Sequence, residues 1–133
     1  MRKTNTITPE QWKAKASKKP NKWRNQPVTI NGIRFDSKAE GAYYRQLCIL
    51  RDKGKLTFER QTRHDIKVNG VLICRYISDF VVTYTDGKKE VIDVKGKETP
   101  EFKLKKKLMK AVHGIDIVIV KHMGNGNFQR ADN

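Results

Sequence analysis

The chain has 133 residues, 37% hydrophobic and 32% charged, which suits one domain with a modest core. It contains no apolar run near the roughly 20 residues that span a bilayer and no leader-like start, so we expect a cytoplasmic protein with no membrane partner. Its 29 Lys and Arg against 14 Asp and Glu give a net charge of +15, which favours nucleic acid as the partner without naming an activity.

The first 26 residues predict a basic N-terminal arm. Residues 1–25 carry eight Lys or Arg and one Glu, and Lys22 and Arg24 are among the basic residues that we expect to contact DNA. The arm could clamp DNA or exchange between subunits. Cys48 and Cys74 form no CxxC pair, so we expect neither a structural zinc site nor a disulfide.

Residues 27–122 have the patterning of one folded domain. Asn31-Gly32 and Asn69-Gly70 each separate two short apolar runs, as in hairpins with two-residue turns. A helix is expected to end before Gly54, and Asp86-Gly87 marks a third turn. The expected elements are a hairpin (28–35), a helix (37–53), a strand (56–61), a second hairpin (66–73) and two strands (76–84 and 90–95).

A second helix is predicted to begin at Thr99-Pro100 and to end at His113, before Gly114. Leu104, Leu108 and Ala111 are expected to face the core. A buried strand should follow over 116–120, and residues 123–133 are predicted to form a loose tail. This order predicts an α/β domain with a mixed, mostly antiparallel sheet flanked by helices.

Two aspartates interrupt strands that are otherwise apolar. Asp79 lies within Tyr76–Val82 and Asp93 within Val91–Val94, although aspartate is depleted in strands and an unpaired buried charge is costly. Lys95 is two residues beyond Asp93, so both project from one face of the strand. With the Val94 carbonyl nearby, two carboxylates and a carbonyl predict a magnesium site, with manganese able to substitute.

The register of the hairpin around Asp86-Gly87 decides whether the two aspartates meet. A two-residue loop would pair Asp79 with Val94 and would point the aspartates to opposite faces. A three-residue loop, with Gly87 in the left-handed conformation, would pair Tyr84 with Lys88 and set Asp79 opposite Asp93. We predict the three-residue loop.

Glu40 is a third candidate acid, on one edge of the first helix. Ser37-Lys38-Ala39-Glu40 also matches a capping box, in which the glutamate serves the helix N-terminus only. Asp93 and Lys95 have a similarly simple alternative as a solvated ion pair along one strand.

Taken together, Glu40, Tyr76-Ile77-Ser78-Asp79-Phe80 and Val91-Ile92-Asp93-Val94-Lys95-Gly96 resemble the PD-(D/E)XK nuclease superfamily, chiefly small phage endonucleases and Holliday-junction resolvases. The resemblance covers residues 27–120 and implies a restriction-endonuclease-like core. It implies that Asp79 and Asp93 hold the metal, that Glu40 supports a metal or its water, and that Lys95 positions the attacking water. Ser78 replaces the usual proline, which has no part in the chemistry.

The resemblance also implies a phage setting in a bacterial cytoplasm and DNA, not a small molecule, as substrate. Symmetric cutting of a recombination junction needs two active sites, so a homodimer is expected. A nicking or restriction-type nuclease of the same fold and a non-catalytic binding module both stay open. The remaining residues that we expect to contact DNA are lysines, namely Lys38, Lys103, Lys105, Lys106, Lys107 and Lys110. The alternative is that these lysines form only a solvated helix face.

Overall fold

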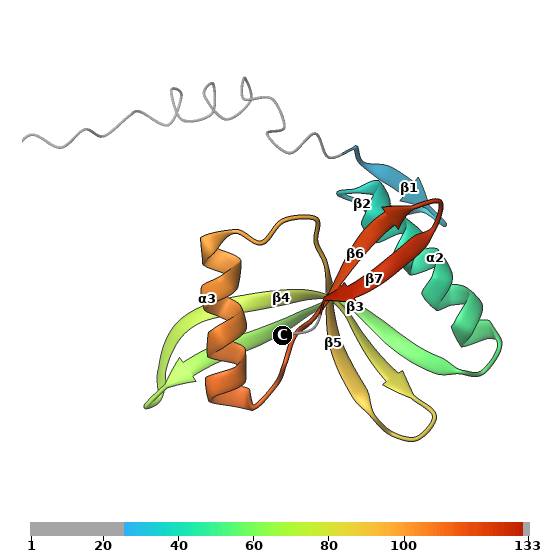
Figure 1. Cartoon of the computed structure of the whole chain (residues 1–133). Coiled ribbons are helices and arrows are strands. Elements are labelled where there is room, and N and C mark those ends of the chain that lie inside the picture. Colours follow the sequence, from blue (N-terminus) through green and yellow to red (C-terminus); the bar gives the residue numbers. More distant parts are fainter. Residues whose placement is uncertain (1–25, 132–133) are drawn as a thin grey trace, which may run out of the picture.

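The computed structural model describes residues 26–131, so the expectations for residues 1–25, including Lys22 and Arg24, lie outside the described residues. A five-stranded sheet of order β3-β4-β5-β6-β7 forms the body, and β1 and β2 form a separate hairpin (Figure 1). The elements are β1 (Val28–Ile30), β2 (Ile33–Phe35), α2 (Lys38–Asp52), β3 (Leu56–Val68), β4 (Val71–Tyr84), β5 (Lys89–Val94), α3 (Pro100–Leu108), a π-helical turn η1 (Met109–His113), β6 (Val118–Gly124) and β7 (Asn127–Ala131).

The predicted α/β class and mixed sheet are confirmed. β5 and β6 pair in parallel, with Ile92 opposite Val118, because α3 carries the chain back across the sheet. The other neighbouring strands are antiparallel. Within residues 26–131, helices capable of crossing a bilayer are absent.

The two helices cover opposite faces of the sheet. On β5, Ile92 belongs to a buried cluster that contains Leu47 of α2, whereas its neighbour Val91 belongs to a second cluster that contains Phe102 of α3. Successive strand residues point to opposite faces, so β5 lies between two cores. Asp93, at the buried end of β5, is therefore enclosed by packing.

Both predicted Asn-Gly turns are present. Asn31 and Asn69 have φ of 52° and 51°, and the glycines that follow them are also left-handed, as a two-residue hairpin turn with this handedness requires. The strands around the second turn are longer than predicted. Pairing continues beyond each short run, so 56–61 joins 66–68 in β3 and 71–73 joins 76–84 in β4.

The prediction of a loose tail is wrong. Residues 127–131 form β7, which pairs with β6 through contacts such as Val120 opposite Arg130. Asn125 (φ 51°) and Gly126 (φ 75°) make a third turn of the same kind. Pairing with β7 satisfies backbone groups that an exposed edge of β6 would leave open.

The predicted core face of the second helix is also partly wrong. Leu104 is 58% exposed and Ala111 is exposed, whereas Phe102 and Met109 are buried. Leu108 packs against the core, as expected. The π-helical turn at 109–113 changes the angular spacing of the last residues, and Phe102 fixes the helix by packing against the sheet.

Candidate active site

The β4–β5 hairpin has the predicted three-residue loop. Gly87 is left-handed at φ 89°, and the Tyr84 amide donates to the Lys88 carbonyl at 2.8 Å. Pairing runs from this turn to Phe80 opposite Ile92. One further step in this register sets Asp79 opposite Asp93, so the prediction is confirmed.

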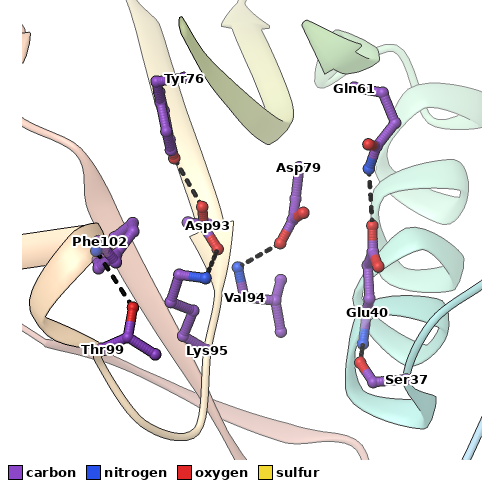
Figure 2. A network of polar contacts seen from close by, with 10 residues as sticks. All are labelled: Ser37, Glu40, Gln61, Tyr76, Asp79, Asp93, Val94, Lys95, Thr99 and Phe102. Atoms are coloured by element: carbon purple, nitrogen blue, oxygen red, sulfur yellow. Dashed lines mark hydrogen bonds and ion pairs between the residues drawn. The ribbon is translucent and has the colours of Figure 1, made fainter. Parts of the chain in front are cut away.

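β4 and β5 separate at this point, and Asp79 spans the gap. Hydrogen-bonded pairs alternate along an antiparallel ladder, so the Val94 amide would donate to the Ser78 carbonyl if the strands continued together. It donates instead to Asp79 Oδ2 at 2.9 Å (Figure 2). Where β4 and β5 separate, the side chain of Asp79 therefore takes the place of the Ser78 carbonyl as acceptor for the Val94 amide.

The backbone of β3 is distorted beside Asp79, although its register with β4 is the same on both sides of the distortion. Arg60 pairs with Phe80 and Thr62 with Ser78, while Gln61 between them has φ of 50°. On either side of Asp79, the buried residues of β4 pack in different cores. Phe80 lies in the α2 core, whereas Tyr76, an even number of residues away, lies in the α3 core.

Tyr76 consequently reaches Asp93. The Tyr76 hydroxyl donates to Asp93 Oδ2 at 2.7 Å, and Lys95 Nζ lies 3.5 Å from Asp93 Oδ1. Lys95 Nζ also lies 4.5 Å from the centre of the Phe102 ring. Asp93 is only 3% exposed, so its pairing with Lys95 is not the solvated ion pair that the sequence left open.

The two aspartates and Glu40 form an acidic cluster, in which Lys95 pairs with Asp93 and Arg60 lowers the pKa of Glu40. Burial and, after it, the negative charges of Asp93 and Glu40 together raise the pKa of Asp79 to about 8. Asp79 therefore keeps a proton at neutral pH when no cation is bound. A hard divalent cation would stabilise the ionised carboxylate and so offset this shift.

Ser37 caps α2 as predicted, and the Glu40 carboxylate is directed to Gln61 of β3. The Ser37 hydroxyl accepts from the Glu40 amide at 3.1 Å, which starts α2, while Gln61 Nε2 donates to Glu40 Oε1 at 3.2 Å. The carboxylate is 7% exposed. Its pKa is raised chiefly by burial and by the charges of Asp36 and Asp93, against the lowering effect of Arg60.

The donor chemistry fits a hard cation such as Mg²⁺. Asp79 and Asp93 supply carboxylate oxygens, and the Val94 carbonyl is the backbone oxygen between Asp93 and Lys95. Among residues 26–131, no three His, Cys, Asp or Glu side chains converge closely enough to form a metal site. Mg²⁺ typically uses one or two carboxylates and keeps several waters, so two aspartates are a sufficient protein contribution.

Comparison with known families assigns the chain to a group. Residues 20–119 match the model of a family described as "Protein of unknown function (DUF1064)". The chain belongs to this family. The matched region contains Glu40, Asp79, Asp93 and Lys95. Neither curated proteins nor solved structures gave a match.

In this DUF1064 member, Lys95 lines three surface pockets, and two of them also reach Asp93 or the start of α2. One, of about 300 Å³, is lined by residues that include Asp93, Arg75 and Ile77. The other, of about 390 Å³, lies between the start of α2 and residues 94–99, and is lined in part by Ser37. Although Asp93 itself is almost fully covered, solvent and a ligand can approach Lys95 from both sides.

The predicted DNA-binding lysines divide into two groups. Lys105, Lys106 and Lys110 form ion pairs with Glu101, Glu98 and Asp116 at 3.2, 3.1 and 2.9 Å. Lys38, Lys103 and Lys107 are exposed.

Sequence reasoning missed two partners of the acids, Tyr76 and Gln61. Tyr76 is three residues from Asp79, a spacing that in a regular strand places two side chains on opposite faces. In the folded protein, Tyr76 nevertheless packs in the α3 core beside Asp93. The positive φ of Gln61 has no signal in the sequence, because glutamine carries no preference for that conformation.

Proposed function

We propose that this DUF1064 member is a metal-dependent endodeoxyribonuclease of the PD-(D/E)XK type. The observation that carries the proposal is the meeting of Asp79, buried Asp93 and Lys95 at the point where β4 and β5 separate. The pKa of Asp79, which is raised to about 8 in the absence of a cation, supports the proposal that this site binds a cation.

The sheet arrangement agrees with the restriction-endonuclease-like fold that the proposal requires. An acid-bearing helix, an aspartate strand, an Asp-x-Lys strand and a basic helix follow in order, and α3 leads to a strand parallel to β5. The proposal includes this fold, since the family assignment itself does not specify one.

In the proposed mechanism, Asp79, Asp93 and the Val94 carbonyl hold Mg²⁺, with Mn²⁺ able to substitute. The cation would acidify water and offset charge on the phosphate. Hydrolysis adds water to phosphorus and breaks one P–O bond to deoxyribose, and the leaving oxygen takes up a proton.

The remaining side chains orient these groups. Tyr76 holds Asp93 Oδ2 through its hydroxyl, which leaves Oδ1 on the side of Lys95. Lys95, steadied over the Phe102 ring, would position the attacking water or bind a phosphate oxygen as negative charge develops. Glu40 would accept a hydrogen bond from water at the site, with its carboxylate held by Gln61.

DNA is the proposed substrate because the net charge is +15 and counterion release favours a polyanion. Lys38, Lys103 and Lys107 are exposed for phosphate contacts. We further propose selectivity for branched DNA, cut by a homodimer, since paired incisions require two active sites.

The test is a cleavage assay on a four-way junction, a matched duplex and a single strand, each with Mg²⁺ or EDTA. Wild type should cut only with metal, and Asp93→Asn and Lys95→Ala should each lose at least about a hundredfold in rate. Asp52→Asn, on an exposed side chain at the end of α2, is the matched control. Equal cutting by Asp93→Asn and wild type would overturn the proposal.

A second candidate, a non-catalytic nucleic-acid-binding module, is favoured by the net charge alone. It predicts that wild type binds all three DNAs and cuts none of them. It also predicts that Asp93→Asn does not change the effect of Mg²⁺ on binding. The same assay therefore separates the two functions.

A further inference from the structure

The β3–β4 hairpin ends in an exposed aliphatic surface that the proposed chemistry does not use. We call it the tip patch; its side chains flank the Asn69-Gly70 turn and are 41–60% exposed, namely Val68, Val71, Leu72 and Ile73. The hairpin extends past α3, away from the rest of the domain (Figure 1). Clustered exposed aliphatic residues of this kind mark interaction surfaces.

Basic residues lie beside the tip patch and farther along the same hairpin. Arg63 and Lys67 on β3 are exposed, and Arg75 on β4 is too. The nearby acid Asp65 is engaged by Arg75, with Arg75 Nε 3.3 Å from Asp65 Oδ1. An aliphatic tip between cations suits a partner that has both apolar faces and negative charge. Nucleic acid has both, in its bases and its phosphates.

The hairpin also leads directly into the site. Arg75 and Ile77 of β4 line the pocket that contains Asp93 and Lys95. From Val71 to Asp79 the strand rises by about 25 Å, at about 3.3 Å per residue. DNA bound at the site and running along this strand would meet the tip about seven base pairs away.

A second copy of the chain fits the tip patch less well. Four half-exposed aliphatic side chains offer about 200 Å² of apolar surface, whereas a stable interface buries about 800 Å² on each partner. A symmetric contact would also bring Arg63, Lys67 and Arg75 of one copy near those of the other. The basic arm in residues 1–25 has the same unfavourable charge.

We propose that the tip patch packs against unstacked bases of branched DNA while Arg63, Lys67 and Arg75 contact the flanking phosphates. An apolar wedge in an intact duplex must first unstack a base step, which costs a few kcal/mol. At a branch point base stacking is already interrupted, so unstacking costs less there and the tip should favour branched over continuous DNA. This inference rests on the proposed DNA-cleaving function and adds a reason for substrate selectivity.

The test compares full-length wild type with Val71→Thr/Ile73→Thr. Both positions are more than half exposed, and threonine keeps the branched shape that strands favour. Met123→Thr, at an exposed methionine on β6, is the matched control. Binding is measured in EDTA, without cleavage, on a four-way junction with 2-aminopurine at the branch and on a duplex of the same sequence.

The double variant should bind the junction about tenfold more weakly and the duplex within twofold of wild type. Wild type and Met123→Thr should raise 2-aminopurine fluorescence on binding, and the double variant should not. Equal junction affinity for wild type and variant would overturn the inference. So would a change from dimer to monomer in sedimentation of the variant, because the tip would then belong to a second copy.

The proposed function fails separately. If wild type cuts no DNA with Mg²⁺, the nuclease is refuted, yet the comparison in EDTA still measures whether the tip contacts a branch. If wild type cuts and the double variant binds the junction normally, the nuclease stands and the tip inference falls.

Discussion

Replacing Asp79 by Asn distinguishes two effects of this buried acid: the lower free energy of unfolding that it causes and its proposed role in binding metal. The pKa of Asp79 is about 8 in the folded protein, against an ordinary value of 3.8. At pH 7 the unfolded chain has this carboxyl ionised, so folding without a cation takes up a proton. At about 1.4 kcal/mol per unit, the three units between the ordinary pKa and pH 7 set a ceiling of about 4 kcal/mol on this cost.

Asparagine removes the charge and keeps an amide oxygen that can accept from the Val94 amide, as Asp79 Oδ2 does at 2.9 Å. We expect Asp79→Asn to be about 1 to 4 kcal/mol more stable than wild type at pH 7 in EDTA. The midpoint of thermal unfolding should rise by at least about 4 °C. DNA cleavage should be lost, because one of the two proposed metal-binding carboxylates is gone.

The assay is urea unfolding in EDTA at pH 5, 7 and 8.5. The folded pKa of Asp79 lies above the unfolded one, so the native state binds the extra proton between about pH 4 and 8. The free energy of unfolding of wild type should therefore fall as pH rises through that window. The fall should be smaller in Asp79→Asn, since asparagine does not titrate.

Asp52→Asn is the control, because the side chain of Asp52 is 73% exposed and its substitution should change stability by less than about 0.5 kcal/mol. Adding Mg²⁺ should stabilise wild type and Asp52→Asn but not Asp79→Asn. The reasoning is refuted if Asp79→Asn is no more stable than wild type in EDTA and has the same dependence on pH.

Three further outcomes are expected. Because Asp79 holds a proton below about pH 8, Mg²⁺ affinity should rise about tenfold per pH unit from pH 6 and level off above 8. Calorimetry in two buffers would detect the released proton. A Mg²⁺ affinity that does not change with pH would contradict this prediction. Tyr76→Phe removes the donor to Asp93, so urea unfolding should reveal a loss of about 1.5 to 3 kcal/mol, and no loss would mean the bond is unimportant. A Cβ at Gly41 would lie 2.7 Å from Val28 Cγ2, so Gly41→Ala should lower the thermal midpoint despite its helix preference; adding Val28→Ala should recover stability, and a gain from Gly41→Ala alone contradicts the packing.

Local chemistry made much of the fold predictable. Asn-Gly pairs adopt positive φ more readily than other residues, so both predicted hairpins were correct, and Asn125-Gly126 carried the same signal for the strand that was missed. Ser37 and Thr99 start α2 and α3 through bonds to amides three residues on. Gly87 fixed the register that sets Asp79 opposite Asp93.

The two faces of α3 could not be read from the sequence. Leu104 is as apolar as Phe102, yet it is 58% exposed while Phe102 is 5% exposed. Which of them is buried depends on the position of the helix over the sheet and on the widened turn at 109–113. Both are set by contacts between residues distant in the chain.

By itself, the sequence determined the hairpin turns and the helix starts. It also determined that two acids and a lysine lie on adjoining strands. Each of these features depends only on residues that are close together in the sequence. The tertiary structure decided that β4 and β5 part at Asp79, that Tyr76 reaches Asp93, and that burial and two neighbouring acids raise the pKa of Asp79. Those features arise where β3, β4 and β5 and two helices meet, and burial by distant segments sets the energy of each charge.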